Sequence, residues 1–228
     1  MNKILFLGHA TVSILTDFGD IVIDPFFTNN PLNPMKVSDC RAKYILVTHG
    51  HSDHLGDTVE IAKANDAFVV SNYEIAMYLV KNGVKNTVPM NIGGRKSFEH
   101  FSVEMVEAIH GSSIEDEGHI IYGGLACGFI VKLPHLTIYH AGDTAVGPYM
   151  GMIGSKNIID IAFLPVGGVY TMDVDDAIMA IKMLHPEYVV PVHYNTWDDI
   201  KVDIEQFKKM VEKETHSKCI ILKPGEGF

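Results

Sequence analysis

Residues 49–54 read His49-Gly50-His51-Ser52-Asp53-His54 and follow the apolar run Tyr44-Ile45-Leu46-Val47, with only Thr48 between them. This stretch places four strong metal-ligand side chains on one tight turn at the end of an expected strand. Imidazole and carboxylate groups hold zinc, iron, manganese or nickel, and four of them on one turn cannot easily all reach a single ion. We interpret the turn as part of a metal site that is shared by two ions.

An accidental match is a poor explanation for this turn. With 12 histidines in a chain of 228 residues, independent placement gives a His-x-His-x-Asp-His pattern at roughly 2 in a thousand. Histidines that only capped a turn would not require three rings at this spacing. The pattern therefore indicates metal chemistry.

Length and composition limit the class of protein. With 47% hydrophobic residues, 228 residues can bury one large core, and we expect a single domain over residues 1–228. The net charge of -10 argues against a surface that binds nucleic acid, although a local basic groove stays open. We expect a small-molecule substrate, and the sequence leaves a homo-oligomer open.

The location is predicted from the cysteines and the first apolar run. Cys40, Cys127 and Cys219 lie far apart without a C-x-x-C spacing, which suggests neither a disulfide framework nor a thiolate zinc site. The apolar run at residues 4–7 is too short for a signal peptide or a membrane span. We therefore expect a cytoplasmic protein with no membrane association.

The order of apolar runs and breakers predicts an α/β fold. Loops are expected at residues 29–34 and 112–118, and Gly83 is expected to end a helix. The expected strands span residues 4–7, 12–15, 21–23, 44–48, 67–70, 101–109, 127–133, 137–139, 160–164, 188–191 and 219–222. The expected helices span residues 56–65, 73–82, 173–184 and 203–215.

Four candidate ligands stand where expected strands end. His49 follows the strand at 44–48, His110 follows 101–109, Asp143 follows 137–139, and His193 follows 188–191. Residues at strand ends can converge on one rim of a sheet, where ligand sites in α/β proteins usually form. We therefore expect these residues to contribute to the same site.

The order of these motifs resembles the metallo-β-lactamase fold superfamily, and within it the UPF0173 metal-dependent hydrolases. The likeness covers residues 3–225 and implies a four-layer αββα sandwich. It is carried by Leu7-Gly8-His9-Ala10, Ile23-Asp24-Pro25-Phe26, the histidine turn, Tyr139-His140-Ala141-Gly142-Asp143-Thr144, Leu164-Pro165-Val166-Gly167-Gly168 and Pro191-Val192-His193-Tyr194-Asn195-Thr196.

The resemblance implies a ligand set for two ions. His49, His51 and His110 would hold the first ion, and Asp53, His54 and His193 the second. Asp143 would bridge them, since a carboxylate has two oxygens that can each reach an ion. Asp24 would support the histidine turn from behind, as outer partners of ligating rings do.

Three further residues keep two interpretations each. His9 has a pocket role or a structural hydrogen bond. His119 reaches a substrate from its loop or is simply solvated there. Trp197 lines the pocket or packs in the core.

The implied function is hydrolysis of a small ester, lactone, amide or phosphoester. Two divalent ions about 3.5–4 Å apart convert a bridging water to hydroxide near neutral pH and polarise the bond under attack. Asp53 is the candidate proton shuttle, and catalysis would depend on Asp53 and Asp143. His51, where the oxygen-reducing branch has Glu, favours hydrolysis over redox chemistry.

Two alternatives and the choice of metal stay open. The alternatives are a nuclease or phosphodiesterase acting on nucleic acid, and a metal-binding module without turnover. The His and Asp ligands favour zinc, with manganese, nickel or iron as alternatives.

Overall fold

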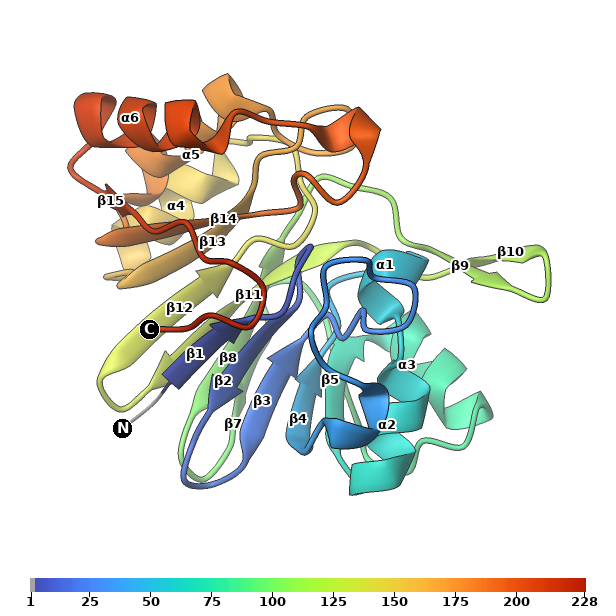
Figure 1. The fold of residues 1–228 in the computed structure, drawn as a ribbon. Coiled ribbons are helices and arrows are strands. Elements are labelled where there is room, and N and C mark those ends of the chain that lie inside the picture. The colour runs from blue at the N-terminus through green and yellow to red at the C-terminus, as the bar shows by residue number, and fades with distance from the viewer. Residues whose placement is uncertain (1–2) are drawn as a thin grey trace. The chain divides into compact units, whose positions relative to one another are not determined.

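The computed structural model describes residues 3–228 and shows mixed helix and sheet structure, which confirms the predicted α/β class (Figure 1). Its contacts divide the chain into two compact units. Unit 1 is drawn from the chain up to Ile92, from Gly111–Ala126 and from Leu222–Phe228, and unit 2 is drawn from Gly93–His110 and Cys127–Ile221. The expectation of one domain over residues 1–228 stays a prediction.

The sheet of unit 1 follows chain order. Its strands are β1 (Lys3–Phe6), β2 (Val12–Leu15), β3 (Asp20–Ile23), β4 (Ala42–Leu46), β5 (Phe68–Asn72) and β6 (Thr87–Met90). The strands β1 to β3 pair antiparallel, whereas β3 to β6 pair parallel. The carboxyl ends of β3 and β4 therefore share one edge of the sheet, and Asp24 and His49 lie just beyond these ends.

Helices α2 (Thr58–Asn65) and α3 (Tyr73–Lys81) cover the sheet of unit 1 (Figure 1). Ile61 and Leu79 on these helices are fully buried and pack with Ile45 and Val69 of the sheet. The short helix α1 (Ser52–Leu55) begins directly after His51. The core of unit 1 thus lies directly behind the histidine turn.

The expectation of a loop at residues 112–118 is wrong. Residues Ser113–Asp116 form β9, which pairs antiparallel with β10 (His119–Tyr122). The hairpin forms although its sequence is acidic, because Ile114 and Ile121 lie opposite each other and both pack against the core of unit 1. The expected loop at 29–34 is free of helix and strand.

The sheet of unit 2 has the order β15-β14-β13-β12-β11-β8-β7. Its strands are β7 (Arg95–Ser97), β8 (Ser102–Glu107), β11 (Cys127–Leu133), β12 (Leu136–His140), β13 (Ile161–Pro165), β14 (Tyr188–Val192) and β15 (Lys218–Cys219). The strand β11 is antiparallel to both β8 and β12, and β12 to β15 are parallel. The strands β8, β12, β13 and β14 therefore all end at one edge.

Helices α4 (Tyr149–Lys156), α5 (Val174–Leu184) and α6 (Ile204–Glu214) lie together on the sheet of unit 2 (Figure 1). Tyr139, Met150, Ile181 and Phe207 are among the buried side chains of its core. Two short 3-10 turns, η1 (Val37–Asp39) in unit 1 and η2 (Asp198–Ile200) in unit 2, complete the regular structure.

Most predicted elements of unit 2 are present with small shifts. Asp173 and Asp203 each cap a helix, since their side chains accept hydrogen bonds from the amides of Asp176 and Gln206. The strand expected at 219–222 is shorter, and α4 was not predicted because its sequence is rich in glycine. A side chain at Gly154 would lie 2.9 Å from Cα of Leu184, so glycine allows α4 to approach α5 closely. Within residues 3–228, every helix is too short or too polar to cross a bilayer.

Candidate metal centre

Asp24 fixes the histidine turn of unit 1 from behind. Its carboxylate is fully buried and accepts hydrogen bonds from the Thr48 amide at 2.8 Å and the Thr48 hydroxyl at 2.7 Å. The other partner is Nδ1 of His54 at 2.8 Å. One carboxylate at the end of β3 thereby contacts the residues at both ends of the turn, which is the position that the family resemblance implied for Asp24.

These contacts also determine which ring nitrogens are available. Nδ1 of His54 contacts Asp24, so Nε2 is the nitrogen of that ring which can face a metal. In the same way Nδ1 of His49 lies 2.9 Å from the Thr48 hydroxyl, and Nε2 of His49 lies 3.1 Å from Nδ1 of His51. Two nitrogens bound to one zinc at about 2.0–2.1 Å in tetrahedral geometry lie about 3.3 Å apart. The His49 and His51 pair fits a shared ion.

Asp53 lies on the same turn and contacts His9. Nε2 of His9 is 3.0 Å from Oδ2 of Asp53, and Nε2 of His54 is 3.8 Å from the same oxygen. The His9 ring is buried and packs edge-on against the rings of Phe26 and His54. His9 therefore contacts a candidate metal ligand, which favours the interpretation that gives this histidine a pocket role.

In unit 2 two imidazoles converge on one carboxylate. Oδ2 of Asp143 is 3.0 Å from Nε2 of His193 and 3.6 Å from Nε2 of His110. Asp143 and His193 are almost fully buried. These separations also bracket the value of about 3.3 Å expected for ligands of one ion, so the donor set of unit 2 fits a metal as well.

The ligands of unit 2 are held by their neighbours in the sequence. Nδ1 of His140 accepts from the Gly142 amide at 3.2 Å, next to Asp143. The hydroxyl of Thr144 accepts from the Ile109 amide at 3.0 Å and lies 2.6 Å from the hydroxyl of Tyr149. Burial raises the pKa of Tyr149 to about 12, so this hydroxyl is neutral near pH 7. The loops after β8 and β12 are therefore joined beside His110 and Asp143.

Two tentative site residues lie on the surface. His119 is exposed on β10, opposite Asp116, and the side chain of Trp197 is 39% exposed just before η2. The structure gives His119 no contact with the other candidates of unit 1. Trp197 is therefore not a core residue.

Sequence reasoning missed Ser112. Its buried hydroxyl accepts from the Gly50 amide at 3.1 Å and donates to the Gly123 carbonyl at 2.9 Å. It thereby ties the base of the β9–β10 hairpin to the turn between His49 and His51. A serine two positions after His110 gives no sign in the sequence of this long-range contact. Thr48, by contrast, directly precedes His49, so its contact with the His49 ring is local in sequence.

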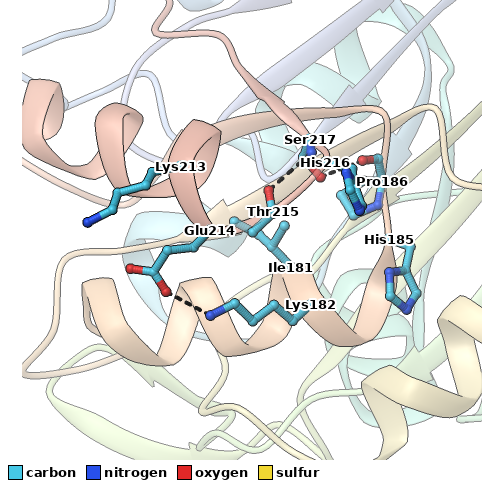
Figure 2. A pocket seen from close by; sticks show the side chains of 9 residues that line it. All are labelled: Ile181, Lys182, His185, Pro186, Lys213, Glu214, Thr215, His216 and Ser217. Carbon is cyan, nitrogen blue, oxygen red and sulfur yellow. Dashed lines mark hydrogen bonds and ion pairs between the residues drawn. The ribbon is translucent and has the colours of Figure 1, made fainter.

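A separate cavity of about 410 Å³ in unit 2 contains none of the predicted ligands (Figure 2). It lies at the ends of α5 and α6, where Lys182 pairs with Glu214 at 2.7 Å. The lining segments at 185–186 and 215–217 precede β14 and β15, so they stand at the opposite edge of the sheet from His193. The cavity is therefore distinct from the ligands of unit 2.

The folded units and their donor sets match a known class. Residues 20–194 match the family described as Beta-lactamase superfamily domain, which makes the chain a member of the superfamily that the motifs resembled. More narrowly, the chain belongs to the UPF0173 metal-dependent hydrolase family. It is 45% identical over 226 residues to such a protein of Natranaerobius thermophilus, covering 99% of this chain and 98% of the relative. A relative in Desulforamulus reducens is 46% identical, with 98% of each chain covered.

Solved structures agree. Igni18, a metallo hydrolase from Ignicoccus hospitalis, has a TM-score of 0.89 at 33% identity, covering 100% of this chain and 97% of that one. An isothiocyanate hydrolase from Delia radicum gut bacteria has a TM-score of 0.76 at 21% identity, with 99% and 98% covered, and shows the fold alone. The predicted family, metallo-β-lactamase fold and class of enzyme are thus confirmed.

Proposed function

We propose that this chain is a dinuclear hydrolase that cleaves a small ester, lactone, amide or phosphoester. The observation that carries the proposal is the convergence of His193 and His110 on one oxygen of Asp143. The matching pair in unit 1, His49 and His51, supports it. Membership of a family of metal-dependent hydrolases favours a catalyst over a metal-binding module without turnover.

The ligand assignment is part of the proposal. His49, His51 and His110 hold one ion, Asp53, His54 and His193 hold the other, and Asp143 bridges them. All seven offer imidazole or carboxylate, which suits zinc first and manganese, nickel or iron as alternatives. When bound, two such ions lower the pKa of a coordinated water and polarise the bond that is cleaved.

The side chains around the ions have separate tasks in this proposal. Asp24 and Thr48 orient the His49 and His54 rings, which fixes the nitrogens that face a metal. Asp53 carries the proton to the leaving group through Oδ2. His9, 3.0 Å from that oxygen, holds the carboxylate in place for the transfer.

The acidic chain supports a small substrate over nucleic acid. A net charge of -10 repels a phosphate backbone. The proposal includes a cytoplasmic location, because the cysteine pattern suits a reducing compartment. Hydrolysis of nucleic acid that weakens steeply with salt would support the nuclease alternative instead.

The test is reconstitution of the metal-free protein separately with zinc, manganese, nickel and iron, followed by a screen of esters, lactones, amides and phosphodiesters. Asp143→Ala should lose metal by elemental analysis and lose turnover by at least about 100-fold, beyond the range of losses for an orienting partner. Asp175→Ala, an exposed change on α5, is the matched control. Full activity or two ions per chain in Asp143→Ala would refute the assignment.

A further inference from the structure

Four large apolar side chains are exposed at the ligand edge of unit 2. They belong to Ile109, Val169, Tyr170 and Trp197, with exposed fractions of 49%, 75%, 53% and 39%. We call these four residues the apolar rim. They follow β8, β13 and β14, the strands that end at the same edge as β12 and its Asp143. Large apolar side chains exposed together at the edge that carries candidate ligands suggest a binding surface.

Ile109 and Trp197 are fixed by the loops that carry the ligands. Ile109 directly precedes His110, and its backbone exchanges hydrogen bonds with the Thr144 hydroxyl at 3.0 Å and the Ala145 amide at 3.2 Å. Trp197 lies in the turn after His193, which is closed by the Ile200 amide on the Trp197 carbonyl at 3.3 Å. The backbone of both residues is therefore held by the loops that carry the candidate ligands.

The loop after β13 is held between the other two ligands. The Met172 amide donates to the carbonyl of Thr144 at 3.0 Å, next to Asp143. At its start, Gly167 packs so closely on the His193 carbonyl that no side chain would fit there. The Gly168 amide closes the loop on the Met172 carbonyl at 3.0 Å. Val169 and Tyr170 form the tip of a loop that contacts the surroundings of both Asp143 and His193.

Val169 has a strained backbone. Its φ is +44°, and the Tyr170 amide donates to the Gly168 carbonyl across it, which makes a γ-turn of the rare positive-φ kind. A β-branched residue is strongly disfavoured in that conformation. Strain of this sort persists where the surroundings impose it, and it is concentrated at functional sites. Here the strained residue and Tyr170 expose two apolar side chains on a loop that contacts Thr144 and His193.

We propose that the apolar rim binds the apolar acyl or aryl group of a neutral ester or amide while the bond to be cleaved lies at the ligands. This inference rests on the proposed function and narrows its substrate class. The charges nearby support a neutral substrate, because Asp173, Asp198 and Asp199 adjoin the rim in the sequence. Of these, Asp198 pairs with Lys201 at 2.9 Å. Carboxylates at this edge disfavour an anionic partner.

The first test uses Trp197, which is the single tryptophan of the chain and so reports directly from the rim. Protein as purified is titrated with unbranched alcohols from ethanol to octanol, which are neutral, and tryptophan fluorescence is followed. The concentration for half the change should fall about fourfold per added methylene, from about 0.8 kcal/mol per buried CH₂. In the Val169→Ser, Tyr170→Ser double variant, the change in this half-saturating concentration per added methylene should be less than about twofold.

The matched control is Ile158→Ser. Ile158 is 89% exposed but precedes β13, at the opposite edge of the sheet, so its variant should keep the full chain-length dependence. An unchanged dependence in the double variant would overturn the inference. So would an equal loss in Ile158→Ser.

A second measurement separates this inference from the proposed function. The ratio kcat/KM is measured for p-nitrophenyl esters of increasing acyl length, and it should rise with length in the wild type and in Ile158→Ser but not in the double variant. If no ester is cleaved while the alcohols still bind with the chain-length dependence, ester hydrolysis fails and the apolar rim stands. If esters are cleaved at rates that do not depend on length in any variant, the rim fails and the hydrolase stands.

Discussion

The two units supply candidate ligands in opposite ways. In unit 1, His49, His51, Asp53 and His54 lie within six residues and depend on one buried carboxylate behind them. In unit 2, His110, Asp143 and His193 follow three different strands, and the shared edge of a sheet brings them together. A local turn can be disabled by removing one support, whereas a sheet edge spreads its support over several loops.

Asp24→Ala should be the most damaging change. It leaves the Thr48 amide, the Thr48 hydroxyl and His54 Nδ1 without their buried acceptor. Removing one partner of a buried polar network costs about 3–5 kcal/mol. We expect that loss in the free energy of unfolding, measured by urea denaturation of metal-free protein so that metal linkage does not contribute.

Asp24→Asn is the matched control for this change. Its amide oxygen can still accept a hydrogen bond from Thr48, so it should retain part of the lost stability. If the free energy of unfolding of Asp24→Ala lies within about 1 kcal/mol of the wild-type value, which is the contribution of an ordinary hydrogen bond, the turn does not depend on a single support.

The second expected effect belongs to unit 2 and appears at high pH. Burial raises the pKa of Tyr149 to about 12 from an ordinary value near 10. Between these values the unfolded chain releases the proton while the folded chain keeps it, so stability present below pH 10 is lost as pH rises toward 12. The loss attributable to this group approaches about 3 kcal/mol.

Tyr149→Phe should therefore show a smaller alkaline loss than the wild type in unfolding experiments across this range. The variant should also lose about 1 kcal/mol at neutral pH with the Thr144 hydrogen bond. Tyr73→Phe, on the exposed surface of unit 1, is the control and should leave the alkaline profile unchanged. Identical profiles for Tyr149→Phe and the wild type would contradict the expected role of this hydroxyl.

The same difference between units explains what could be predicted from the sequence. Local signals sufficed for the histidine turn, for the helix expected at 173–184 and for the strand Cys127–Leu133, because each depends on neighbours in the chain. Features made by distant contacts were missed. The helix α4 was not predicted, although Gly154 lets it pack on α5, and nothing in the sequence marks Val169 as a residue with positive φ. The contact of His9 with Asp53 likewise exists only after folding.

Ser112→Ala should have a third, smaller effect. It leaves the buried Gly50 amide without its acceptor, at a cost of about 1–3 kcal/mol, whereas the Gly123 carbonyl keeps the hydrogen bond that it accepts from Nδ2 of Asn72 at 2.7 Å. Because Gly50 lies between His49 and His51, metal affinity should fall about 10-fold, the lower end for orienting partners. Competition with a chelator measures the affinity, and the exposed Ser38→Ala serves as control. Equal affinities in the two variants would show that the hairpin does not support the turn.

His51→Ala should change stability least and chemistry most. The side chain is only partly buried and makes no hydrogen bond as cap of α1, and the carbonyl that receives the His54 and Leu55 amides remains in alanine. We expect a loss of less than about 1 kcal/mol in metal-free protein, together with loss of one ion per chain by elemental analysis and of most turnover. His119→Ala, an exposed histidine of the same unit, should keep both ions. Two ions in His51→Ala would mean that the turn binds metal without this ring, and a large loss of stability would mean that the ring builds the turn that we assign to Asp24.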